Sequence, residues 1–272
     1  MDGNALLIRE TTVRFGEGQR LSGIVTEPDQ PGGTAVLLLN AGLVHHAGPA
    51  CLYVKLARRL AADGVLALRF DFAGIGDSEP RRDGLPFETA APQDTSQAMD
   101  FLAATYGIRR FVLAGICSGA ITAFHAAQAD ERVRAIALMN AQGYVTGDGI
   151  QAAQSNRYLL RVSLRRRNSW WRLLRGQVDV MGVLRSLLGR LRRPSAEREQ
   201  IRGLARGFAT LTRRGVRILH LYVENDPGLV ELERLMPGAR PVTIRQADHM
   251  FTPVAAQRQV AELLAGWVGE EG

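Results

Sequence analysis

The stretch FVLAGICSGAITAFHAA, residues 111–127, limits what this chain can fold into more than any other part of the sequence. It begins as a short apolar run typical of a buried β-strand and ends as a run typical of a helix. Only the corner Gly115-Ile116-Cys117-Ser118-Gly119 separates the two. A strand that turns directly into a helix brings backbone segments close together, so small residues are needed beside the turn. The stretch therefore predicts a strand, a tight corner with Cys117 at its tip, and a helix.

Strands and helices are predicted to alternate through most of the chain. Two strands joined by a Gly-rich turn are predicted at 5–15 and 20–28. Further strands, most of them continuous apolar runs, are predicted at 34–42, 65–72, 111–116, 133–141, 216–224 and 240–247. Helices are predicted at 51–64, 93–107, 118–130, 228–236 and 254–268. This alternation indicates an α/β protein with a mostly parallel sheet and helices on both faces.

The alternation lapses over residues 143–208, and the positive charge of the chain is concentrated there. The formal net charge of the chain is +7, whereas residues 144–210 carry 14 arginines against four acidic residues, a local balance of +10. Helical spacing gives this segment one apolar stripe, made of Val180, Val183, Leu184, Leu187, Leu188 and Leu191. We therefore expect an arginine-rich helical cap at 143–208, inserted between two parts of one core, 1–142 and 209–272.

Composition argues against several other classes of protein. Hydrophobic residues make up 46% of the chain and charged residues 22%, which predicts a packed core rather than disorder. The two cysteines give no disulfide framework. The N-terminal residues lack the pattern of a signal peptide, and no apolar run approaches the ~20 residues that a membrane span needs. These features favour a soluble, cytoplasmic protein.

Four motifs, in order along the chain, resemble those of the α/β-hydrolase family. DFAGIGDS (71–78) resembles the loop after the fourth strand, where Asp71 is expected to bond backbone amides. GICSG (115–119) resembles the nucleophile elbow, with cysteine in the central position. VENDPG (223–228) and ADHMFTP (247–253) resemble the loops that carry the family's acid and histidine. The resemblance covers essentially the whole chain and implies the α/β-hydrolase fold, with the helical cap inserted late in the chain.

The resemblance assigns catalytic roles to Cys117 as nucleophile, His249 as base and Asp226 as acid. The position of the cysteine supports its role, because the dipole at the start of a helix favours a thiolate there. Three alternatives stay open at this point. Ser118 is a rival nucleophile, Glu224 is a rival acid, and Cys117 is a small buried residue if the elbow is inactive.

The oxyanion hole is expected on two segments. The backbone N–H of Ser118 is one expected donor, because the residue after the nucleophile supplies it in such elbows. The family usually has His-Gly after the third strand, but this chain has Asn40-Ala41-Gly42-Leu43. The N–H of Gly42 or Leu43 is therefore expected to be the second donor.

Two adjacent histidines, His45 and His46, follow this loop. They are expected either to line the substrate site or to form a polar pair in the loop. A metal site made of these histidines and Cys51 is disfavoured, because the sequence offers no carboxylate nearby. We expect neither a metal nor a cofactor.

A cysteine in the elbow indicates acyl chemistry through a thioester intermediate. We expect a thioesterase or acyltransferase acting on acyl thioesters, as in natural-product biosynthesis. One alternative is a small ester or lactone hydrolase, similar to the dienelactone hydrolases that also carry cysteine in the elbow. Another is a catalytically silent hydrolase-fold binding protein. The elbow and NAGLVHHAGP (40–49) also resemble hydrolases encoded beside exosortase and natural-product assembly genes.

The charge of the expected cap predicts an acidic partner, such as an acyl carrier protein with its phosphopantetheine-bound thioester. The expected contacts are Arg165, Arg166, Arg167, Arg192 and Arg193. The alternative is a solvated lid whose arginines lie over its own apolar stripe. No nucleic-acid partner is expected, because the sequence contains no recognised nucleic-acid-binding module.

Overall fold

The fold is built on one sheet with helices packed against it, in a computed structural model that describes residues 8–144 and 195–270. Its strands are β1 (Arg9–Phe15), β2 (Leu21–Glu27), β3 (Thr34–Leu39), β4 (Leu66–Phe70), β5 (Arg110–Ile116), β6 (Val133–Met139), β7 (Arg217–Val223) and β8 (Val242–Ile244). The helices are α1 (Leu52–Ala62), α2 (Phe87–Tyr106), α3 (Ser118–Ala129), α7 (Ser195–Arg213), α8 (Gly228–Leu235) and α9 (Val254–Gly269), with short 3₁₀ turns at Glu17–Gln19 and Pro49–Cys51.

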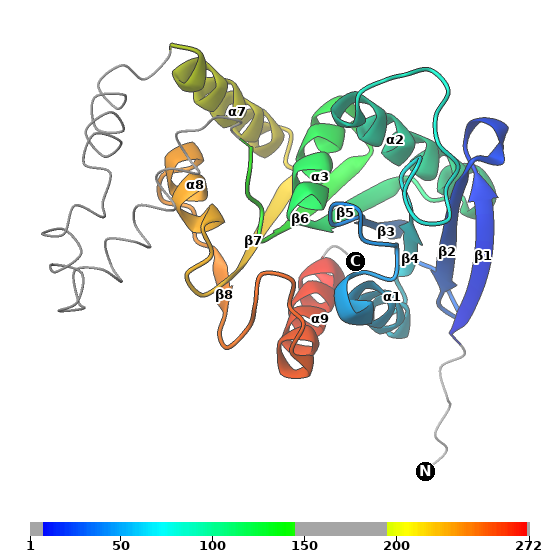
Figure 1. Ribbon diagram of the computed structural model, residues 1–272. Coiled ribbons are helices and arrows are strands. Elements are labelled where there is room, and N and C mark those ends of the chain that lie inside the picture. The colour runs from blue at the N-terminus through cyan, green and yellow to red at the C-terminus, as the bar shows by residue number, and fades with distance from the viewer. Residues whose placement is uncertain (1–7, 145–194, 271–272) are drawn as a thin grey trace, which may run out of the picture. The chain divides into compact units, whose positions relative to one another are not determined.

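The sheet has the strand order β1-β2-β4-β3-β5-β6-β7-β8. β1 pairs with β2, and β2 with β4, in antiparallel register, whereas all the other pairs are parallel. Helices α1 and α9 pack together on one face, and α2 and α3 on the other (Figure 1). The predicted α/β architecture, a mostly parallel sheet with helices on both faces, is therefore confirmed.

The central strands carry the apolar core. β4 and all but the first residue of β3 and of β5 are buried, as expected for parallel strands covered by helices on both sides. A polar side chain on these strands would cost free energy unless it had a buried hydrogen-bond partner. The strands are therefore made of mostly apolar residues. The carboxyl ends of β3, β5, β6 and β7 therefore lie at one edge of the sheet, where the loops between strands and helices begin.

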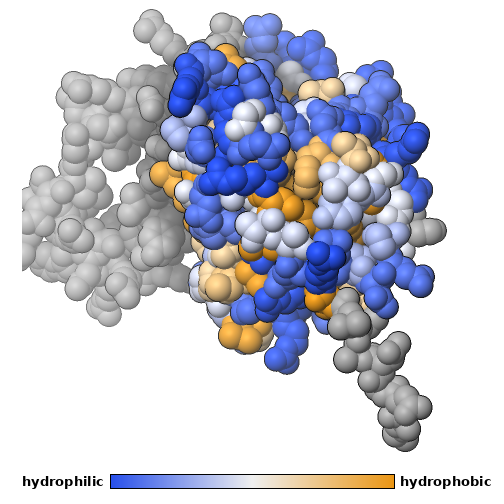
Figure 2. All heavy atoms as spheres, turned by 90° about the vertical axis from the view of Figure 1, so that its right-hand side faces the viewer, coloured by the Kyte–Doolittle hydropathy of each residue, from blue (hydrophilic) through white to orange (hydrophobic). Residues whose placement is uncertain are grey.

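β1 forms an edge of the sheet and carries charged side chains. Its exposed or half-exposed residues include Arg9, Glu10 and Arg14. Figure 2, which looks onto this side of the molecule, shows a mostly hydrophilic surface with apolar residues scattered between polar ones. Charged residues on an edge strand discourage pairing with another chain.

The corner between β5 and α3 has the predicted form. Cys117 is the last residue before α3 and has φ 56° and ψ −117°, a conformation that residues with a side chain rarely adopt. A Cβ on Gly115 would lie 2.4 Å from the backbone carbon of Gly119. A Cβ on Gly119 would lie 2.6 Å from the carbonyl oxygens of Leu39 and Asn40. Both glycines are therefore required by close backbone contacts.

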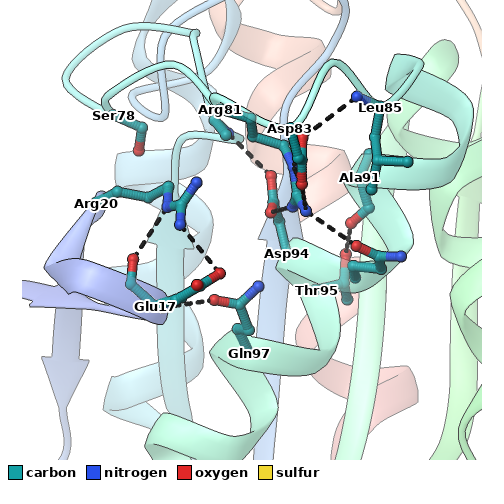
Figure 3. Close-up of polar contacts among 12 residues, drawn as sticks. Glu17, Arg20, Ser78, Arg81, Asp83, Leu85, Ala91, Asp94, Thr95 and Gln97 are labelled. Atoms are coloured by element: carbon teal, nitrogen blue, oxygen red, sulfur yellow. Dashed lines mark hydrogen bonds and ion pairs between the residues drawn. The ribbon is translucent and has the colours of Figure 1, made fainter.

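The loop that follows β4 is fixed to α2 by ionic and hydrogen-bonded contacts. The guanidinium of Arg81 donates to Asp94 over 2.9 Å and also pairs with Asp83 (Figure 3). The other carboxylate oxygen of Asp94, which is buried on α2, accepts the N–H of Ala73 over 3.0 Å. The loop is thus held at both of its ends before the chain enters α2.

Two elements differ most from their predicted bounds. α2 begins at Phe87 and contains Pro92, whereas the prediction started this helix at residue 93. A proline removes one backbone donor and usually ends a helix, but here the helix continues through it. β8 is only three residues long, although the sequence predicts a strand over 240–247.

The chain divides into two compact units, one made of Met1–Gly143 with Gly207–Gly272, and the other of Tyr144–Arg206. Most of the second unit lies outside the described residues, including the apolar stripe and Arg165, Arg166, Arg167, Arg192 and Arg193. The predicted cap at 143–208 therefore stays a prediction. In the first unit, Phe208 of α7 packs on Phe124 of α3, with ring centroids 4.3 Å apart.

None of the helices within residues 8–144 and 195–270 combines the length and apolar character needed to cross a membrane.

We predict that Gly119→Ala lowers the free energy of unfolding by about 1–3 kcal/mol, because the added methyl group has to push two backbone carbonyls apart. Gly266→Ala is the matched control. Gly266 lies on exposed α9 surface with nothing within 4 Å of an added Cβ, so alanine should stabilise that helix by about 0.5–1 kcal/mol. Urea unfolding followed by circular dichroism measures both. Equal effects of the two substitutions would contradict the packing argument at the corner.

Candidate active site

Cys117 stands at the tip of the corner, half-buried, at the carboxyl edge of the sheet. Its backbone N–H donates to the carbonyl of Met139 at the end of β6 over 3.0 Å. Its carbonyl accepts the N–H of Ala120 in the first turn of α3. The side chain is therefore held at the amino end of a helix, where the free N–H groups favour an anion.

His249 and Asp226 meet beside this cysteine, although they lie on different loops. Nδ1 of His249 is 2.7 Å from Oδ2 of Asp226. Asp226 is only 4% exposed, and its other oxygen accepts the N–H of Gly228 over 2.8 Å. Glu224, the alternative acid, is exposed, and its backbone N–H bonds to Ile244 at the end of β8. Of the two candidate acids, the structure brings Asp226 to the histidine.

The electrostatics of the pair favour charge separation. The hydrogen bond with His249 lowers the pKa of the Cys117 thiol, and burial opposes this effect. The hydrogen bond with Asp226, followed by that with Cys117, raises the pKa of His249 to about 9. A lowered thiol pKa beside a raised imidazole pKa favours the thiolate–imidazolium form of the pair over the neutral form.

Two asparagines, Asn40 and Asn140, end the strands on either side of β5. Asn140, which follows β6, donates its amide N–H to the carbonyl of His249 over 2.6 Å and accepts the N–H of Val223 over 2.8 Å. Asn40, which follows β3, accepts the N–H of Phe72 over 2.8 Å. Each side chain is buried. Its hydrogen bonds satisfy backbone groups at the point where the hydrogen bonds of the sheet stop. Sequence reasoning did not single out either role.

Gln142 is a further residue of the site that the sequence did not reveal. Its Nε2 lies 3.2 Å from Nε2 of His249 and 4.0 Å from Sγ of Cys117. The only signal in the sequence is its place, three residues after the last residue of the buried strand β6. Loops that begin at the carboxyl ends of parallel strands carry functional groups in open α/β sheets.

The loop after β3 lies against the elbow through a contact of Ser118. The N–H of Gly42 donates to the hydroxyl oxygen of Ser118 over 2.8 Å. The Ser118 side chain is therefore directed toward this loop, and the Gly42 N–H already has a partner. Leu43, the other predicted donor, is 87% exposed.

A buried tyrosine joins the two strands from which these loops arise. The hydroxyl of Tyr53 donates to the carbonyl of Leu39, the last residue of β3, over 2.8 Å. It accepts the N–H of Ile116, the last residue of β5, over 3.1 Å. Tyr53 thus fixes the loop after β3 against the corner that holds Cys117.

The predicted pair His45 and His46 occupies two different environments. His46 is 3% exposed, and its Nδ1 lies 2.7 Å from Oδ2 of Asp71. His45 is half-exposed, and its Nε2 lies 3.2 Å from Asp77. The expectation that no carboxylate is near these histidines was wrong, because the pairing of β3 with β4 brings the loop after β4 beside them.

These four side chains form the one group in the described part of the chain with the residue types of a metal site, with their ligand atoms within 4.8 Å of one another. Asp71, however, already accepts four hydrogen bonds, which fills both its oxygens. The donors are the amide of Asn40, the N–H and Nδ1 of His46, and the N–H of Asp77. A cation would displace several of these hydrogen bonds. The group is therefore better explained as a hydrogen-bonded link between two loops than as a metal site.

Comparison with known proteins assigns the chain to a family. The sequence profile described as "alpha/beta hydrolase fold" matches residues 42–269. No curated protein matches the chain. Among solved structures, a dienelactone hydrolase from Anabaena variabilis has a TM-score of 0.58 and 18% identity, and the alignment covers 96% of each chain.

Two further structures are similar to the same extent. An alpha-beta serine hydrolase homologue from Coxiella burnetii has a TM-score of 0.57 and 16% identity, with 94% of this chain and 95% of that chain covered. The esterase domain of a Rhodothermus marinus protein has a TM-score of 0.56 and 20% identity, with 97% and 99% covered. Because the family profile spans most of the sequence, the chain belongs to the α/β-hydrolase-fold family, and the predicted fold is confirmed.

Proposed function

We propose that this protein is an acyl-processing hydrolase that uses Cys117, His249 and Asp226 as a catalytic triad and forms an acyl-S-enzyme intermediate. The observation that carries the proposal is the convergence of three groups from three separate segments of the chain. Asp226 holds Nδ1 of His249 at 2.7 Å, while the hydrogen bond between His249 and Cys117 lowers the pKa of the thiol. This is the order of contacts that nucleophile, base and acid need.

In the first half of the reaction, the Cys117 thiolate attacks the acyl carbonyl and a carbon–sulfur bond forms. The tetrahedral intermediate then collapses, and the bond to the leaving group breaks. The imidazolium of His249 gives its proton to the leaving atom, so the histidine becomes neutral. Asp226 stays ionised throughout and keeps the ring oriented for this transfer.

The negative oxygen of the intermediate needs donors that are already in place. The backbone N–H of Ser118 begins α3 beside the nucleophile and supplies one. The N–H of Gly42 is engaged with the Ser118 hydroxyl, so we assign the second donor to the N–H of Leu43. Tyr53 supports this assignment, because it ties the start of the same loop to β5.

In the second half, a water molecule attacks the thioester carbon and gives its proton to Nε2 of His249. The carbon–sulfur bond breaks, the carboxylic acid leaves, and the thiolate–imidazolium pair is restored. A thiol or alcohol in place of water would give acyl transfer by the same steps.

A thiolate with a lowered pKa is a good leaving group as well as a nucleophile, so it needs an acyl group that is already activated. Thioesters, enol esters and lactones meet this requirement. An acidic acyl carrier protein as substrate donor is supported only by the charge of residues 144–210, of which 145–194 lie outside the described part of the chain.

The identity of the nucleophile is tested by a matched pair of variants. Cys117→Ala should lower kcat/KM for an activated thioester by at least about 10³-fold, since removal of a nucleophile leaves only binding and the oxyanion hole. Ser118→Ala should keep most of the activity, because it retains the backbone N–H and loses only the contact with Gly42. An active Cys117→Ala enzyme with an inactive Ser118→Ala enzyme would reverse the assignment. Two inactive proteins that still bind acyl compounds would favour the silent binding protein.

The charge state of the cysteine is tested by alkylation. In a Cys51→Ser background, Cys117 is the sole thiol, and iodoacetamide reacts with its thiolate. The thiolate is present above the lowered thiol pKa, and the imidazolium that stabilises it is lost as the pH rises through about 9. His249→Gln should therefore slow alkylation at pH 7 by about tenfold, since an ordinary thiol is only a few per cent ionised there.

The control for this experiment is Gln259→Ala, which changes an exposed residue of α9 and should leave the alkylation rate as it is. If His249→Gln reacted as fast as the Cys51→Ser parent at pH 7, the histidine would not activate the cysteine, and the triad would be refuted.

A further inference from the structure

We propose that Gln142 is a further catalytic residue, which donates a hydrogen bond to the leaving-group atom and so favours oxygen esters and lactones over thioesters. The inference rests on the proposed function, in which Cys117 attacks the carbonyl and His249 protonates the leaving atom. Gln142 reaches both reacting groups, with its Nε2 3.2 Å from Nε2 of His249 and 4.0 Å from Sγ of Cys117.

The strand order places Gln142 on the side of the leaving group. β5, which carries the elbow, lies between β3 and β6 in the sheet. The expected oxyanion donors are on the β3 side, because the Ser118 hydroxyl contacts the loop after that strand. Gln142 follows β6, and His249 is tied to the same segment by Asn140. The oxygen and the leaving atom of a tetrahedral intermediate diverge from one carbon, so the leaving atom points toward Gln142.

The segment that carries Gln142 is fixed at each residue around it. The Asn140 N–H donates to the carbonyl of Leu221 over 2.8 Å, and the hydroxyl of Tyr222 donates to the carbonyl of Ala141 over 3.0 Å. The N–H of Gly143 donates to the carboxylate of Glu231, which is buried on α8, over 2.8 Å. The amide of Gln142 is thus positioned by a rigid scaffold, as a group that acts on a substrate must be.

The contact with Cys117 shows which end of the amide faces the site. In the thiolate–imidazolium pair, Nε2 of His249 carries a proton, as does the Nδ1 that bonds to Asp226, so the ring offers no acceptor. The acceptor beside Gln142 is the sulfur of Cys117, 4.0 Å from Nε2 of the amide, and only the NH₂ end of the amide can donate to it. When a substrate binds, its leaving atom enters beside Nε2, where the imidazolium N–H and the amide N–H both point.

Two hydrogen-bond donors stabilise a leaving atom most when the negative charge is localised on that atom. As the bond to the acyl carbon breaks, the electron pair goes to the leaving atom, and the proton arrives from His249. A developing alkoxide or phenolate oxygen accepts strong hydrogen bonds, whereas sulfur is a weak acceptor. Gln142 therefore accelerates departure of oxygen much more than departure of sulfur. By the reverse path, the same amide holds the oxygen of the attacking water in the second half of the reaction.

The test compares phenyl acetate with S-phenyl thioacetate, which share one acyl group and differ only in the leaving atom. Gln142→Ala should lower kcat/KM for the oxygen ester by about tenfold, the value of one hydrogen bond to a charged group. It should lower kcat/KM for the thioester by less than about threefold. Gln142→Glu keeps the shape but donates nothing when ionised, so it should show at least the same loss on the oxygen ester.

Gln259→Ala serves as the control and should leave both values unchanged, and thermal unfolding of each variant checks that it is folded. An equal loss on the two substrates, or no loss on either, would overturn the role of Gln142 as a leaving-group donor. That outcome is distinct from failure of the proposed function, which would appear as full activity of Cys117→Ala on both substrates.

Discussion

At the corner between β5 and α3, Cys117 is held in a strained conformation by the backbone segments packed around it. Its backbone, at φ 56° and ψ −117°, is unfavourable for a residue with a side chain and persists only because its surroundings hold it. Gly115 and Gly119 allow the strand, the helix and the loop after β3 to touch through their backbones. The result is a sulfur that projects from the carboxyl edge of the sheet at the start of a helix, between β3 and β6, with a polar loop on either side.

In the proposed mechanism, the loops on the β3 side and on the β6 side of Cys117 have different roles. On the β3 side, Asn40 and Tyr53 fix the loop that we assign to the oxyanion. On the β6 side, Asn140 fixes the backbone of His249, and Gln142 faces its ring. Buried side-chain amides are suited to fixing these loops, because each amide can both donate and accept a hydrogen bond where the hydrogen bonds of the sheet end. In the proposed mechanism, a carbonyl bound over Cys117 therefore has charge-stabilising groups on one side and proton-transferring groups on the other.

The sequence predicted the parts of this site that depend on local pattern. The corner follows from a strand, small residues and a helix, and the chain order of Cys117, Asp226 and His249 follows from the family motifs. Gln142 and Asn140 were missed because an amide after a strand has no pattern of its own. Their partner His249 is more than 100 residues away in sequence. The contact of His46 with Asp71 likewise depends on β3 lying beside β4, which no local pattern predicts.

Mass spectrometry of the acylated protein would show whether the sulfur of Cys117 carries the acyl group. The protein would be mixed with an activated acetyl thioester, quenched in acid within the first turnover and digested for peptide mapping. We expect a mass increase of one acetyl group on the peptide that contains Cys117. Hydroxylamine should remove this group, and the Cys117→Ala protein should not show it. An acetyl group on Ser118, or product formation without any adduct in the first turnover, would contradict this expectation.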